Sequence, residues 1–112
     1  MAVDHGEVES QVEYGIMLFT GDVIPKDQKK AAFYFKKAAD SGDPEGQFRY
    51  GHCLVTGEGV PRDETQVAAY FKMSAEQGFA DGMSAYGKCL QDGIGVKQDR
   101  IRSAILFQLA AA

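Results

Sequence analysis

Apolar side chains recur along this chain with the spacing of helices rather than of strands. Between residues 64 and 77, the side chains at i, i+3, i+4, i+7 and i+8 fall on one helical face; these are Val67, Tyr70, Phe71, Ser74 and Ala75. The preceding apolar stretch, residues 44–56, begins with Pro44, which suits a first helical turn because an N–H there has no partner. The pattern therefore predicts a pair of helices.

The pair recurs every 36 residues without a gap, since Tyr14, Tyr50 and Tyr86 are separated by 50 − 14 = 36 and 86 − 50 = 36 positions. Other residues keep the same register, among them Gly21, Gly57 and Gly93, and Phe35, Phe71 and Phe107. Repeats of this length indicate stacked units that share one continuous core. We therefore expect an all-α fold, an α/α solenoid (a right-handed superhelix) of three 36-residue helix-turn-helix repeats.

We expect one repeat domain over residues 1–112. Residues 1–6 align with the tail of a second helix, the repeats cover 7–42, 43–78 and 79–112, and the last of them is truncated. Neither end carries the polar capping element usual in a solenoid. The sequence therefore suggests part of a longer array.

The boundaries of the helices are marked by capping residues. Gly57 follows the first helix of the middle repeat and suits the left-handed conformation that ends a helix. Asp63 precedes the second helix and is a favoured N-cap, and Gln66 completes a capping-box pattern three residues later. Glycines such as Gly46 and Gly51 recur inside the first helices, at a cost of about 1 kcal/mol each against alanine. We expect another helix to pass close to them.

Three segments of the middle repeat carry a family resemblance. They are Gly-Gln-Phe-Arg-Tyr-Gly (46–51), Thr-Gly-Glu-Gly-Val-Pro-Arg-Asp (56–63) and Ser-Ala-Glu-Gln-Gly (74–78). This pattern resembles the Sel-1-like repeat family, which is related to the tetratricopeptide repeats. The third loop, residues 92–99, matches as well, whereas the first has Val23 in place of a glycine. The resemblance implies a helical scaffold for protein–protein interaction.

Composition and charge exclude several classes of function. Hydrophobic residues make up 45% of the chain and charged residues 25%, as in an ordinary globular protein. A net charge of −4 without a basic stripe argues against binding nucleic acid. No apolar run reaches the ~18–20 residues of a membrane span, and the first residues do not resemble a secretory signal. We expect no nucleic-acid or membrane partner and a cytoplasmic location.

The cysteines and histidines do not form a convincing catalytic or metal site. Cys53 and Cys89 stand one repeat apart, and packed helices lie ~8–10 Å apart, whereas a disulfide needs Cα atoms within ~7 Å. We expect both to be buried thiols; the two cysteines per repeat of disulfide-rich family members are absent. His52 adjoins Cys53, but neighbouring helical residues point about 100° apart. We expect no enzyme activity, no cofactor and no metal.

The resemblance to tetratricopeptide repeats also predicts which side chains bind a partner, since first helices line the concave face of such solenoids. Projected from the small residue at Gly51, that face includes Val12, Ile16, Phe19, Glu45, Phe48, His52, Val55 and Lys88. Clustered exposed apolar residues commonly mark a protein-binding site, and an extended groove suits a peptide or helix. The alternative is that several of these residues belong to the core.

The sequence thus predicts an adaptor or scaffold module that binds a partner peptide or helix in its concave groove. A second hypothesis is a regulatory docking segment of a larger protein that contains an enzyme. A third, a hydrolase acting in the groove, lacks a nucleophile–base pair. The lysines of residues 26–37 form a solvated face or, alternatively, a site for an acidic partner. We also expect end-to-end self-association through the uncovered ends of the stack.

Overall fold

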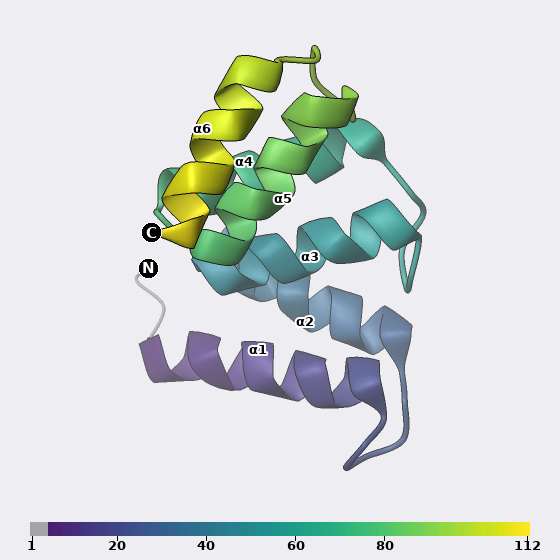
Figure 1. Ribbon diagram of the computed structural model, residues 1–112. Coiled ribbons are helices and arrows are strands. Elements are labelled where there is room, and N and C mark those ends of the chain that lie inside the picture. The colour runs from purple at the N-terminus through teal and green to yellow at the C-terminus, as the bar shows by residue number, and fades with distance from the viewer. Residues whose placement is uncertain (1–4) are drawn as a thin grey trace.

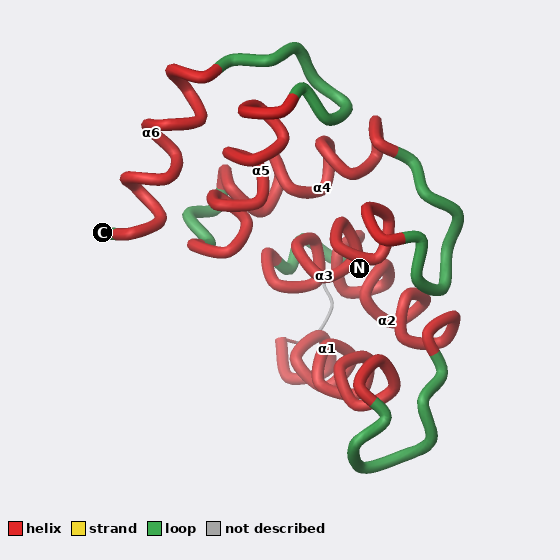
Figure 2. Tube along the Cα trace, turned by 45° about the vertical axis from the view of Figure 1, so that its right-hand side comes forward, coloured by secondary structure: helices red, strands yellow, loops and turns green. Residues whose placement is uncertain are grey.

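The computed structural model describes residues 5–112, which form six helices and no strand (Figure 1). The helices are α1 (His5–Thr20), α2 (Gln28–Asp40), α3 (Pro44–Thr56), α4 (Glu64–Glu76), α5 (Ala80–Asp92) and α6 (Arg100–Ala111). Each helix packs mainly against the next one along the chain. Figure 2 shows the three longer loops along one edge of the stack and the tight turns at the other. The predicted all-α solenoid of three repeats is confirmed.

The boundaries of the helices follow the predicted ones with small differences. α3 spans the predicted residues, whereas α4 ends at Glu76 and Gln77 is its C-cap. His5 and Gly6 form the first turn of α1 and are not the tail of a separate preceding helix. The other residues assigned to that tail, 1–4, lie outside the described residues.

Aspartates begin the second helix of every repeat. The carboxylates of Asp27, Asp63 and Asp99 accept the backbone N–H three residues later at 3.1, 3.2 and 3.1 Å. The Gln66 side chain donates to the Asp63 carboxylate at 3.1 Å and does not reach back to the backbone, so the capping box differs from its predicted form. Gly57 has φ 74° and ends α3 as predicted.

The glycines inside the first helices mark close contacts between helices. A Cβ atom on Gly51 would lie 2.6 Å from the ring of Phe71, and one on Gly46 would lie 2.7 Å from the Cβ of Ala38. Both distances are far below van der Waals contact. Gly51 thus permits the packing of α3 on α4, and Gly46 permits the packing of one repeat on the next. The prediction of close helix crossings is confirmed.

One core of buried side chains runs through all three repeats and includes Phe35, Cys53, Phe71 and Cys89. Phe35 and Phe71 are 2% and 5% exposed, whereas their equivalent Phe107 is 37% exposed. The difference arises because α6 packs mainly against α5 and, within residues 5–112, no further helix covers its other side. The free thiols are buried, and burial raises the pKa of both Cys53 and Cys89 to about 11. The prediction of buried thiols is confirmed.

Candidate functional site: a groove between α1 and α3

Side chains of α1 and α3 line two adjoining hollows that share Ile16. The larger, of about 340 Å³, is lined by Glu9, Val12, Glu13, Ile16, Asp43 and Glu45. The smaller, of about 30 Å³, is lined by Ile16, Phe19, Thr20, Phe35, Arg49, His52 and Cys53. We call the two hollows together the α1/α3 groove. The surface formed by the two hollows, to which Phe35 of α2 also contributes, thus changes from acidic to apolar along its length.

Four carboxylates lie along the larger hollow, on Glu9, Glu13, Asp43 and Glu45. Asp43 is also the N-cap of α3 and accepts the N–H of Gly46 at 2.7 Å. In the described part of the chain no cluster of His, Cys, Asp and Glu side chains is arranged to hold a metal ion. Because these carboxylates do not form such a cluster, they suit an extended cationic ligand better than a single metal ion.

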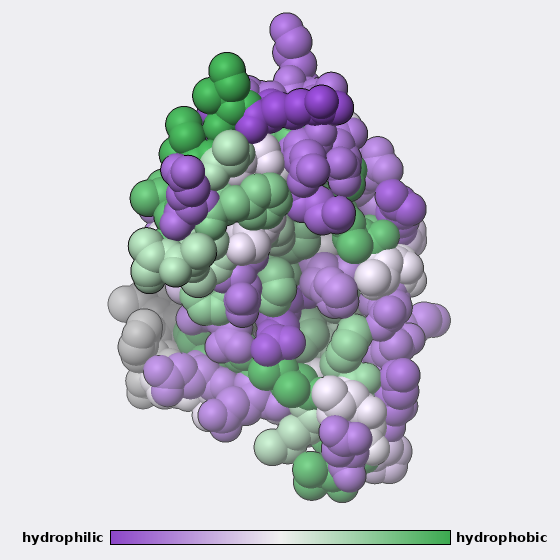
Figure 3. Space-filling view, viewed as in Figure 1, coloured by the Kyte–Doolittle hydropathy of each residue, from purple (hydrophilic) through white to green (hydrophobic). Residues whose placement is uncertain are grey.

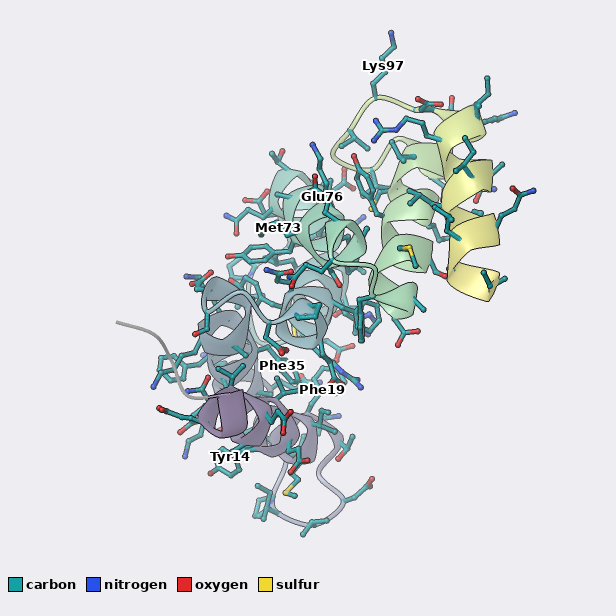
Figure 4. All side chains as sticks on the ribbon, turned by 90° about the vertical axis from the view of Figure 1, so that its left-hand side faces the viewer. Tyr14, Phe19, Phe35, Met73, Glu76 and Lys97 are labelled. Atoms are coloured by element: carbon teal, nitrogen blue, oxygen red, sulfur yellow. The ribbon has the colours of Figure 1, made fainter. Side chains whose placement is uncertain are left out.

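The smaller hollow is built around the ring of Phe19. That ring lies 6.4 Å from the ring of Phe35 beneath it and 6.2 Å from the imidazole of His52 on α3. Figure 4 shows Phe19 and Phe35 close together where α1 meets the rest of the stack. His52 is exposed, whereas Phe19 and Ile16 are half-buried. This end of the groove therefore offers apolar surface to a ligand while its base remains part of the core.

Five of the predicted partner-binding residues line this groove: Val12, Ile16, Phe19, Glu45 and His52. The structure therefore brings these residues of the first two repeats together along one groove. The prediction that Val12 is exposed is wrong, since its side chain is only 3% exposed and packs with Val8 and Ala38. It forms part of the floor of the groove and is not an exposed contact.

The other three predicted residues, Phe48, Val55 and Lys88, lie outside the groove. Phe48 is half-buried, with its ring 5.9 Å from Phe71 and 6.0 Å from Phe79, so it joins the packing between α4 and α5. Val55 is half-buried against the same core. The Lys88 side chain is 69% exposed and pairs with Asp92 at 3.6 Å. Phe48 and Val55 are half-buried, like Ile16 and Phe19, but they lie outside the groove, and their part in binding stays a prediction.

Glu13, Asp43 and Arg49 are charged residues of the groove that the sequence analysis did not assign to the binding surface. Arg49 forms an ion pair with Glu45 at 3.3 Å, and its guanidinium lies 6.0 Å from the centre of the Phe48 ring. Glu9 and Glu13, like Glu45 and Arg49, are four residues apart on one helix, a spacing that places their side chains on the same face. That spacing was the signal available in the sequence.

Neither cysteine is placed to act as a nucleophile. Cys53 is completely buried, while its neighbour His52 is exposed, so the two side chains leave α3 in different directions. Burial keeps the Cys53 thiol protonated at neutral pH because its pKa is raised to about 11.

Among the described residues, no helix combines the length and apolar character that crossing a bilayer requires.

Comparison with known proteins supports the repeat pattern throughout the chain. A family model described as the Sel1 repeat matches residues 8–43, 44–79 and 80–112. The crystal structure of a Sel1 repeat protein from Oxalobacter formigenes has a TM-score of 0.89 and 31% sequence identity. The match covers 93% of this chain and 30% of that protein. No curated protein sequence matches this chain.

Two further solved structures are similar. One is c5321, a protective antigen of uropathogenic Escherichia coli strains with an SLR fold, at a TM-score of 0.89 and 29% identity over 95% of this chain and 23% of that one. The other is Helicobacter pylori cysteine-rich protein B, at a TM-score of 0.73 and 17% identity over 94% and 86%; this last likeness concerns the fold alone. The chain thus spans less than a third of each of the first two proteins.

Proposed function

Because the chain belongs to the Sel1 repeat family, whose repeats generally serve as scaffolds for protein interactions, we propose that it binds a segment of a partner protein in the α1/α3 groove. The observation that carries the proposal is the adjoining acidic and apolar surface at Ile16. A repeat scaffold supplies such a surface at the junction of two units without needing a preformed cavity.

The chemistry of the groove indicates which segment fits. Glu9, Glu13 and Asp43 have no ion pair among the described residues, so their carboxylates are available to lysine or arginine side chains. Ile16 and Phe19 offer apolar contact at the other end. The favoured ligand is therefore a peptide or helix that combines basic residues with a large apolar residue.

Selection from a displayed random peptide library tests the proposal. We expect enrichment of peptides that combine basic residues with a large apolar residue, and we expect their affinity to fall as ionic strength rises. The double variant Glu9→Lys plus Glu13→Lys should reduce the affinity of a selected peptide at least tenfold. Both positions are exposed, so the substitutions should leave the helical content unchanged.

A matched control separates a local effect from a change in net charge. Asp22→Lys plus Glu64→Lys changes the charge by the same amount at exposed positions outside the groove. It should retain most of the affinity. Equal loss in both double variants would mean that the attraction is non-specific, and selection of acidic peptides would contradict the proposed ligand. Circular dichroism confirms that each variant is folded before its affinity is compared.

A further inference from the structure

A pair of tyrosines packs edge to face in each of the first two repeats. The rings of Tyr14 and Tyr34 lie 5.0 Å apart at 72°, and those of Tyr50 and Tyr70 lie 4.9 Å apart at 84°. In the third repeat, 36 residues further on, Tyr86 keeps the first position of the pair. The second position holds Leu106, so that Tyr86 lacks its aromatic neighbour.

The second tyrosine of the middle repeat also has polar partners. The hydroxyl of Tyr70 donates to the carboxylate of Asp40 at 3.2 Å, and the ammonium of Lys36 pairs with the same carboxylate at 3.1 Å. The positions equivalent to Asp40 and Lys36 in the next repeat are Glu76 and Lys72. Neither side chain has an ion pair or hydrogen bond among the described residues. The carboxylate and the ammonium that contact each other beside Tyr70 are thus repeated at these positions, but the next repeat has no tyrosine at the position equivalent to Tyr70.

A hollow of about 310 Å³ lies at this place, lined by Lys72, Ala75, Glu76, Tyr86, Arg102, Ile105 and Leu106. Figure 4 labels Glu76 on α4, and Figure 3 shows strongly hydrophobic surface over the neighbouring helix α6. Tyr86 is 5% exposed, and the hollow meets it at that remaining surface. The tyrosine that would fill the hollow belongs at position 106, inside this chain, and not in a following repeat. A further repeat stacked beyond α6 in the same geometry would therefore leave the hollow open.

We propose that this hollow binds a tyrosine side chain of a partner protein. The ring would pack edge to face on Tyr86, and its hydroxyl would donate to the Glu76 carboxylate, as Tyr70 does to Asp40. Arg102, which lines the hollow, occupies the position of Lys30, whose ammonium lies 5.7 Å from the centre of the Tyr14 ring, so the same register assigns its cation to the ring of Tyr86. The proposal concerns a surface separate from the α1/α3 groove and does not depend on it.

Charge complementarity favours tyrosine over other aromatic side chains. A phenol donates to a free carboxylate, whereas phenylalanine would leave Glu76 without a partner. Lys72 and Arg102 attract the face of any aromatic ring and therefore do not discriminate between phenol and phenyl. The selectivity of the hollow thus rests on Glu76.

The test is an NMR titration of the isotope-labelled chain with N-acetyl-tyrosinamide. We expect weak, saturable binding with shift changes confined to Lys72, Glu76, Tyr86, Arg102 and Leu106. N-acetyl-phenylalaninamide should bind about fivefold more weakly, which corresponds to one hydrogen bond to a charged acceptor that remains in contact with water. Absence of saturable binding, or shifts spread over the whole surface, would overturn the proposal.

Two variants check the location and the selectivity. Leu106→Tyr restores the repeated residue and fills the hollow from within, so it should abolish binding while raising the melting temperature. Glu76→Ala should keep the binding of the aromatic ring and remove the preference for tyrosine over phenylalanine, whereas the control Glu64→Ala should change neither. Unchanged affinity in folded Leu106→Tyr, or an unchanged preference for tyrosine in folded Glu76→Ala, would overturn the assignment.

Discussion

The hydroxyl of Tyr70 donates a hydrogen bond to Asp40 at 3.2 Å and so ties α4 to α2 of the preceding repeat. Lys36 pairs with the same carboxylate at 3.1 Å, and this hydrogen bond, with the charge of Asp40, raises the pKa of Lys36. Burial, followed by the charge of Asp40, raises the pKa of Tyr70. The phenol therefore remains a donor, and the lysine a cation, throughout the neutral and mildly alkaline range.

Removing this hydroxyl should weaken the stack by a small amount. Tyr70→Phe keeps the edge-to-face packing on Tyr50 and removes only the hydrogen bond, so we expect a loss of about 0.5–1.5 kcal/mol in the free energy of unfolding. Urea denaturation measures it. Tyr34→Phe is the matched control, since its hydroxyl makes no hydrogen bond within the described residues while its ring packs in the same way. Equal losses in both variants would show that the bond to Asp40 contributes nothing.

Glycines at equivalent positions should respond differently to substitution by alanine. A Cβ on Gly51 would lie 2.6 Å from the ring of buried Phe71, whereas one on Gly87 would lie 3.2 Å from the ring of Phe107. Phe107 is 37% exposed and can move. We expect Gly51→Ala to destabilise the chain by about 1–3 kcal/mol through overpacking. Gly87→Ala should be neutral or stabilising by up to about 1 kcal/mol, the usual helical preference of alanine.

Thermal and urea unfolding measure the change in stability of Gly51→Ala and Gly87→Ala. If both glycines tolerate alanine equally, the close approach of Phe71 to α3 does not limit the packing of the middle repeat.

The order of the elements could be predicted from the sequence because each repeat carries its own residues for ending and starting helices. Gly57 and Asp63 mark the end of one helix and the start of the next through local backbone geometry, which the three-fold repetition makes visible. Asp43, the N-cap of α3, was overlooked because Pro44 already explained that helix start. α5 begins after Phe79, which makes no capping hydrogen bond and packs its ring against Phe48.

The binding surface was harder to predict because exposure depends on neighbouring side chains and not on register alone. Val12 and Phe48 occupy equivalent positions, yet Val12 is covered through contact with Val8 and Ala38, whereas Phe48 is covered by two aromatic rings. The hollow at Tyr86 depends on one substitution, Leu106, in an otherwise regular series. Comparing the repeats with one another could have revealed it, since Tyr34 and Tyr70 stand at the equivalent positions.

The buried thiols should react slowly and should link stability to pH. With a pKa of about 11, Cys53 and Cys89 carry about 100-fold less thiolate near pH 8 than a thiol with a pKa of 9.0. We expect alkylation of the native chain to be slowed at least by that factor, while both thiols react rapidly in urea. An added exposed thiol, Ser84→Cys, is the control for reagent access.

The same shifts set the direction of the pH dependence. Because the folded state holds the thiol protons more tightly than the unfolded state, their contribution to stability is complete below pH about 9 and is lost as the pH rises through about 11. Urea midpoints across this range should fall, and the fall should be smaller in Cys53→Ala plus Cys89→Ala. A double variant with an unchanged pH profile would contradict the account.

The outer face of α1 argues against the end-to-end self-association expected from the sequence. Gly46 and Gly82 allow each repeat to approach the one before it, and the equivalent residue on α1 is Ser10. A Cβ atom added to the loop glycines Gly59 and Gly95 would lie 2.6 and 2.7 Å from carbonyl carbons of the preceding repeat. The equivalent residue in the first loop is Val23, whose side chain is 75% exposed. Both close approaches are blocked by side chains in the first repeat.

A second copy therefore cannot place its α6 on α1 in the geometry that joins the repeats. We expect this chain to be monomeric in light scattering at high concentration, with a mass near 12.2 kDa. Ser10→Gly plus Val23→Gly removes both obstacles and should promote association, whereas Ser84→Gly, an exposed serine of α5, should not. The mass of the wild-type chain could instead double with concentration, and do so equally in the variant Ser10→Gly plus Val23→Gly. That result would mean that copies join through another surface. The exposed apolar residues Ile101, Ile105 and Leu109 of α6 would then be the first to substitute.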